Sequence, residues 1–104
     1  MANPWAGEVT VTLDGAPQVC KLTLGALVAL EAELDSGSLV DLVQRFESGG
    51  FKSSDIMAVI CAGLRGGGWQ GTADDLLTVD IAGGPIAAAQ AAALLLARAF
   101  AMPE

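Results

Sequence analysis

The amino-acid sequence predicts an α+β fold in which an N-terminal β-hairpin is followed by four or five helices. Residues 8–13 alternate apolar and polar side chains before a turn dipeptide, and the chain after residue 22 shows helical segments separated by capping residues and glycines. The length of 104 residues suits one domain, 1–104, and 53% of these residues are apolar. Because only 16% are charged, the composition favours a folded core over disorder.

The hairpin is predicted from a period of two residues. Val9, Val11 and Leu13 fall on one face of a strand, because alternate side chains of a strand point to the same side. Asp14-Gly15 then provides a two-residue turn of the kind that joins antiparallel strands tightly. We therefore expect the chain to return as a second strand that ends near residue 22.

Two helices are expected next, over residues 24–35 and 38–48. Thr23 is a good N-cap for the first, since its hydroxyl can accept a hydrogen bond from a backbone N–H of the first turn. Ser38 and Asp41 have the spacing of a capping box at the start of the second. The second helix carries apolar residues at helical spacing on one face: Leu39, Leu42, Val43 and Phe46.

Two further helices are expected after a pair of glycines. The longer covers residues 54–65, with Ser53 or Ser54 as its N-cap. The shorter covers residues 73–78, and Thr72 is placed to cap it.

The last helix, predicted over residues 85–101, is almost entirely apolar. Between Ile86 and Ala101, only Gln90 and Arg98 have polar side chains. The segment is shorter than the roughly 20 apolar residues of a bilayer span. A helix that is apolar on all sides is normally buried, so this one is expected either to form the centre of the core or to offer one face to a partner.

Charge argues against two classes of partner. The formal net charge is −7, and the five basic residues are scattered singly along the chain. Nucleic-acid binding requires clustered Lys and Arg, and an anionic membrane surface would repel the protein. Residues 1–7 lack the basic start and apolar stretch of a secretory signal, which leads us to expect a cytoplasmic protein.

Side chains typical of catalytic sites are missing from the sequence. It contains no histidine and no tyrosine, which removes the usual general base and any His-dependent triad. Cys20 and Cys61 lack the neighbouring ligands of a zinc site and are expected to be reduced thiols. Asp74-Asp75 falls in a first helical turn, where acids stabilise the helix dipole. We expect no enzyme activity, no metal and no cofactor.

Glycines at residues 66–71 formally match a dinucleotide-binding fingerprint. A helix rather than a strand precedes them, so we expect an ordinary loop. Trp69 within this loop is either a lid over the core or a hot spot for contact with another protein.

Three stretches resemble the gene transfer agent family of small tail-cluster proteins, from alphaproteobacterial gene transfer agents and related tailed phages or prophages. They are the hairpin leading into Leu22–Glu31, the Leu-Arg-Gly-Gly-Gly run within Gly63–Gly68, and Gly83-Gly84 before an Ala/Leu-rich helix. The resemblance covers nearly the whole chain. It implies a tail assembly chaperone that binds the tape measure protein before the tail tube polymerises, with tail-tube subunits as further candidate partners.

Two alternatives remain open. One is a structural tail component, such as a tube or connector subunit, and the other is a small-molecule or nucleotide binder. A tube subunit needs long strands for a continuous sheet, which the single hairpin does not offer, so the sequence favours the chaperone. Self-association also stays open. The candidate partner-binding residues are Leu95, Leu96 and Phe100 on the last helix, with Arg65 and Trp69 in the neighbouring glycine-rich loop.

Overall fold

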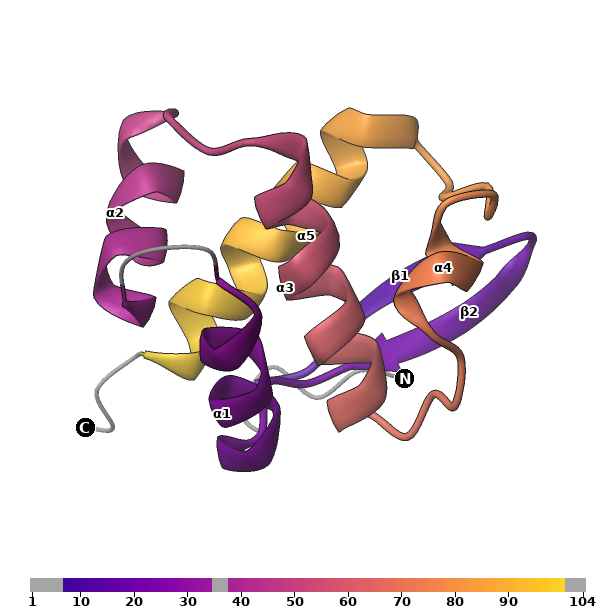
Figure 1. The fold of residues 1–104 in the computed structure, drawn as a ribbon. Helices are drawn as coiled ribbons and strands as arrows, with labels where there is room; N and C mark the ends of the chain where they lie inside the picture. Colours follow the sequence, from indigo (N-terminus) through magenta and orange to yellow (C-terminus); the bar gives the residue numbers. More distant parts are fainter. Residues whose placement is uncertain (1–6, 35–37, 101–104) are drawn as a thin grey trace.

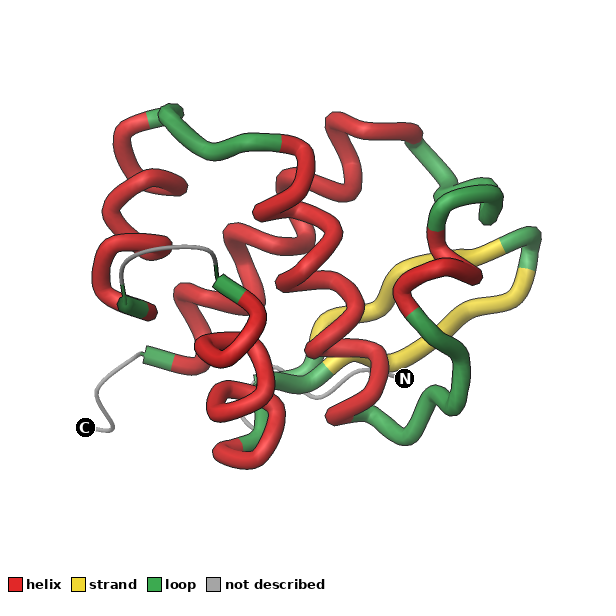
Figure 2. The backbone as a smooth tube through the Cα atoms, viewed as in Figure 1, coloured by secondary structure: helices red, strands yellow, loops and turns green. Residues whose placement is uncertain are grey.

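The computed structural model describes residues 7–34 and 38–100 and confirms the α+β fold, with a hairpin followed by five helices. The elements are β1 (Val9–Leu13), β2 (Ala16–Cys20), α1 (Leu24–Glu33), α2 (Leu39–Ser48), α3 (Ser53–Gly66), α4 (Ala73–Leu76) and α5 (Gly84–Ala99). Figure 1 shows α3 crossing α5 at the centre, with the hairpin and α4 on one side and α2 on the other. Figure 2 shows that helices make up most of the backbone.

The hairpin forms as its sequence predicts. The two strands pair antiparallel, with Leu13 opposite Ala16. Asp14 and Gly15 between them have φ angles of 49° and 83°, the two positive values that a type I′ turn requires. The alternate residues of β1 are buried, so one face of the hairpin packs on the helices.

Other parts of the chain cover the outer edge of β1. Leu13 forms a β-bridge with Ile81. At the turn, the backbone N–H of Asp14 donates to the carbonyl oxygen of Asp80 at 2.8 Å, and the N–H of Asp80 donates to the Asp14 carboxylate at 3.0 Å. The segment before α5 therefore lies as a short stretch of backbone along the outer edge of β1.

The end of α3 covers the outer edge of β2 through a set of glycines, here called the glycine junction: Gly63, Gly66 and Gly67. The carbonyl oxygen of Gly63 accepts a hydrogen bond from the Lys21 N–H at 2.8 Å. A Cβ on Gly66 would collide with the carbonyl oxygen of Lys21, and one on Gly67 with that of Val19. The Gly-rich run thus lets two backbones touch, which only glycine permits at such a distance.

Side chains attach α2 to the rest of the protein. Leu42 is fully buried, and the rings of Phe46 and Phe51 stack with their centroids 4.8 Å apart. Arg45 donates two hydrogen bonds to the Asp55 carboxylate, from Nε at 3.2 Å and from Nη2 at 3.1 Å. These contacts, here called the α2 attachment, join α2 to the start of α3.

Asp55 also determines where α3 begins. Its carboxylate accepts a hydrogen bond from the Lys52 N–H at 2.8 Å, and Lys52 is the N-cap. The prediction of Ser53 or Ser54 as the cap was therefore wrong. The cap is Lys52, and the carboxylate of Asp55, three residues further along, accepts the hydrogen bond from its backbone N–H. Burial raises the pKa of Asp55, but the hydrogen bonds from Arg45 and Lys52 outweigh it and lower that pKa below its usual value.

The predicted N-caps of α1, α2 and α4 are confirmed, while α5 begins at Gly84, one residue before its predicted start. The Thr23 hydroxyl accepts from the Ala26 N–H at 3.1 Å, and Ser38 forms its capping box with Asp41. Thr72 forms a similar box and begins the short helix α4. Helices α1 and α5 end at residues 33 and 99, two positions before the predicted ends, while residues 35 and 101 lie outside the described part of the chain.

The core lies between the hairpin and helices α3 and α5. Its fully buried large side chains are Leu30, Leu42, Val59, Ile60, Leu64, Leu95 and Leu96, together with Cys20. The two cysteines are free thiols, and burial raises the pKa of Cys20 to about 12. Among the described residues, every buried side-chain nitrogen and oxygen has a hydrogen-bond partner.

Candidate protein-binding surfaces

Helix α5 has one buried face and one exposed face. The buried residues are Ala88, Ala91, Ala92, Leu95 and Leu96. Among the exposed ones, Ile86 is 73% exposed, Leu94 41% and Phe100 43%. The structure thus combines the two expectations for this helix, since it forms part of the core and also leaves apolar side chains in solvent.

The exposed face of α5 follows a regular spacing. Five exposed positions alternate steps of four and three residues, and a sixth lies beside them; together they are called the α5 stripe: Ile86, Gln90, Ala93, Ala97, Phe100 and Leu94. Steps of four and three are the spacing by which one helix packs along another. The stripe carries no charge, so it is suited to an apolar helical partner.

The structure corrects the expectation for two of the predicted contact residues. Leu95 is 0% exposed and Leu96 is 2% exposed, and both belong to the core. Leu95 packs so closely on α3 that a Cβ on Gly63 would lie 2.8 Å from its Cδ1 atom. They are therefore not accessible on the folded domain, and Phe100 is the one predicted α5 contact that reaches the surface, at the helix C-cap.

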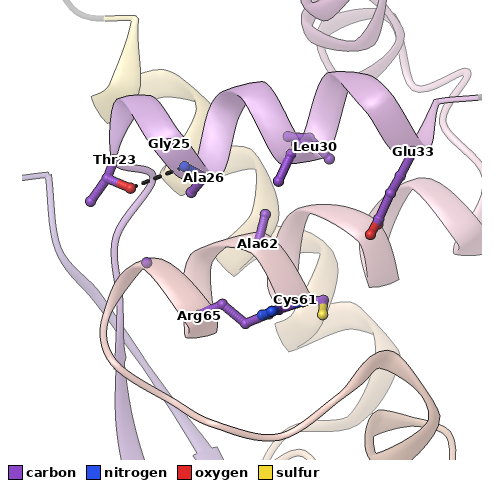
Figure 3. A pocket seen from close by; sticks show the side chains of 10 residues that line it. Thr23, Gly25, Ala26, Leu30, Glu33, Cys61, Ala62 and Arg65 are labelled. Atoms are coloured by element: carbon purple, nitrogen blue, oxygen red, sulfur yellow. Dashed lines mark hydrogen bonds between the residues drawn. The ribbon is translucent and has the colours of Figure 1, made fainter.

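A groove of about 320 Å³ lies between α1 and α3 (Figure 3). It is called the α1–α3 groove. Half of the ten residues that line it are glycines or alanines: Gly25, Ala26, Ala29, Ala62 and Gly66. The side chains of Leu30 and Cys61 also contribute to its lining. The groove exists because these residues are too small to fill the space between the two helices.

Two charged side chains of opposite sign also line the groove. Figure 3 shows Glu33 descending from α1 and Arg65 extending from α3 in the direction of Cys61. Both are exposed, and neither makes a hydrogen bond or ion pair within the described part of the chain. Burial raises the pKa of the Cys61 thiol, the Glu33 carboxylate raises it further, and Arg65 lowers it. Both charged side chains are therefore close enough to the Cys61 thiol to affect its pKa.

Trp69 packs against the core and not in the groove. It is half-buried, and its backbone N–H donates to the Leu64 carbonyl oxygen at 2.9 Å. Its indole lies so close to Gly71 that a Cβ on this glycine would collide with the ring. These contacts match a lid over the core, one of the two roles considered for this residue.

The five predicted contact residues thus occupy different environments: the groove, the core, the loop and the end of α5. Three further residues of these surfaces are not among the predicted contacts: Ile86, Leu94 and Glu33. The sequence carries no local signal for the first two, because the helix is apolar on every side and its faces show no contrast. For Glu33, the signal was an acid placed at a helix C-terminus, where the dipole disfavours negative charge.

Within residues 7–34 and 38–100, no three His, Cys, Asp or Glu side chains gather in a way that could hold a metal ion. No described helix is both long and apolar enough to cross a bilayer.

Comparisons with known proteins agree with the earlier resemblance. Neither a search of curated proteins nor a search of solved structures gave a match. The sequence does match the family described as "Phage tail tube protein, GTA-gp10", over residues 6–102. Because this match spans nearly the whole chain, the protein belongs to that family of tail proteins from phages and gene transfer agents.

Proposed function

We propose that the protein is a non-enzymatic adaptor of tail assembly, a chaperone that holds a helical segment of the tape measure protein on the α5 stripe. The observation that carries this proposal is the uncharged stripe itself, which leaves Ile86, Leu94 and Phe100 in solvent. Such capture would take place in the cytoplasm, before tail-tube subunits surround the tape measure protein.

The geometry of the stripe suits a transient helix pair. Ile86 and Phe100 lie about 21 Å apart along the helix axis, at 1.5 Å per residue, and so can anchor four turns of a partner. Ala93 and Ala97 between them are small enough to let a second backbone approach closely. Removing this apolar surface from water favours binding by roughly 25 cal/mol per Å².

The hairpin supports an adaptor over a tube subunit. A subunit that builds a ring from a continuous sheet must offer free strand edges to its neighbours. Here Ile81 lies beside β1, and the glycine junction lies beside β2. Pro17, in β2, has no N–H to donate.

A structural tail subunit is the second candidate, because the description of the family names a tail tube protein. This candidate predicts rings or polymers of the isolated protein and its presence in purified particles. The chaperone is expected to be missing from finished particles.

The decisive experiment is co-expression with the tape measure protein encoded in the same gene cluster, followed by co-purification and size-exclusion chromatography. The wild-type protein should keep the tape measure protein soluble in a stable complex. Leu94→Glu and Ile86→Glu should each abolish co-elution, because either places a charge in the stripe. Leu77→Glu is the matched control, since Leu77 is 68% exposed but lies outside α5.

Separate elution of the two wild-type proteins, with an insoluble tape measure protein, would remove the main support for the chaperone. Detection of the protein in purified particles would favour the structural subunit instead.

A further inference from the structure

We propose that the α1–α3 groove is a second protein-binding site, distinct from the α5 stripe. Its occupant is an amphipathic helix of another tail protein, with short side chains at its centre. This helix carries an acidic side chain beside Arg65 and a basic one beside Glu33.

The shape of the groove suits side chains of a partner. Its volume of about 320 Å³ is more than one side chain fills. Because Gly25, Ala29 and Ala62 have at most a methyl group as side chain, a second helix can approach the backbone of α1 and α3. A long side chain at any of the three positions would close this approach.

The charges of the groove specify which partner fits. Arg65 and Glu33 each lack an ion-pair partner within the described part of the chain, so both can pair with groups from outside. A ligand of uniform charge would satisfy one of them and be repelled by the other. A helix bearing one acid and one base satisfies both, and in only one direction along the groove.

A second copy of this chain is a poor occupant. The protein carries a net charge of −7, so two copies repel each other. Of its five basic residues, Arg45 is already paired with Asp55, Arg98 donates to the carbonyl oxygen of Glu8, and Arg65 lies in the groove itself, which leaves Lys21 and Lys52. A different protein is therefore the better match for Glu33.

The test uses the full chain and overlapping fluorescent 20-residue peptides that cover the tail proteins encoded in the same gene cluster. We expect at least one peptide to bind, as measured by fluorescence anisotropy. Arg65→Glu and Glu33→Arg should each weaken it about three- to fivefold, as loss of an exposed ion pair implies. Glu47→Arg is the matched control for Glu33, since Glu47 is also exposed near a helix C-terminus, and it should have no effect.

Exchanging the two charges makes the test sharper. The double variant Glu33→Arg with Arg65→Glu keeps the net charge at −7. It should prefer a copy of the peptide in which the acid and the base are exchanged, while the wild-type protein prefers the original.

The proposal fails if no peptide binds, or if every bound peptide is indifferent to both single variants. It also fails if the groove variants change the sedimentation of the protein alone, because the occupant would then be a second copy. Leu94→Glu should leave peptide binding in the groove unchanged, which separates this test from that of the α5 stripe.

Discussion

Helix α3 is held at its two ends by different kinds of contact. At its start, the α2 attachment joins side chains through the Arg45–Asp55 pair and the stacked rings of Phe46 and Phe51. At its end, the glycine junction brings backbone against backbone, with no side chain between. Side chains can change rotamer to accommodate a substitution, whereas two touching backbones cannot. The two ends should therefore differ greatly in their tolerance of mutation.

The largest effect is expected at the glycine junction. Gly67→Ala places a Cβ against the carbonyl oxygen of Val19, which forces the end of α3 away from the hairpin. We expect a loss of about 4 kcal/mol or more in the free energy of unfolding, at the upper end for single substitutions. Urea denaturation followed by circular dichroism measures it. Gly50→Ala is the control, because a Cβ there lies 3.5 Å from Ser48 Oγ, an ordinary contact. Equal stability of the two variants would contradict the proposed backbone contact.

The next effect is expected in the α2 attachment. Leu42→Ala removes a fully buried side chain and should cost about 3 kcal/mol, less than the junction variant because the cavity can partly collapse. Val40→Ala on the same helix, where Val40 is 60% exposed, should cost well under half as much. A loss for Leu42→Ala as large as that of Gly67→Ala would remove the distinction between the two ends of α3.

Asp55→Asn should cost about 2–3 kcal/mol at neutral pH, because it leaves Arg45 without its carboxylate partner in a partly buried site. The pKa of Asp55 is lowered in the folded protein, so this stabilisation is present above the pKa of the unfolded chain. It is lost as the pH falls through the folded pKa. Thermal unfolding from pH 7 to pH 2.5 should show the wild-type protein and the variant converging below about pH 4. A constant difference across this range would show that the charge of Asp55 is not responsible.

The smallest effect is expected at the start of α2. Ser38→Ala removes one half of a capping box in an exposed position and should cost about 1 kcal/mol. Hydrogen exchange of the first-turn amides of α2 should accelerate, while that of α3 amides stays unchanged. Faster exchange in both helices would mean that α2 and α3 open together.

Local signals predicted most of this fold. Asp14-Gly15 determined the turn by its own backbone preference, and Ser38 with Asp41 determined the start of α2 through a contact three residues apart. The close contact of Gly67 with Val19 joins residues far apart in sequence, so nothing near either residue indicates it. The Gly-rich run was recognisable as a motif, but its physical role required the structure.

The other feature that local sequence patterns could not predict was which face of α5 is buried. A helix with apolar residues on every side gives no contrast between faces, so Leu95 and Leu96 were as plausible surface residues as Leu94. In the folded protein both of the first two are buried, and Leu95 packs against Gly63. The same lack of contrast hid Ile86, which proved to be among the most exposed apolar residues of the described chain.

The two edges of the hairpin lie against other backbone of the same chain, which affects whether further strands can be added to it. A strand with a free edge templates the addition of further strands and can be trapped at the tip of a polymer. With Ile81 beside β1 and Gly67 beside β2, the hairpin should neither seed such growth nor terminate it. Under the proposed chaperone role, the protein can be present while tube subunits polymerise without being incorporated through its hairpin.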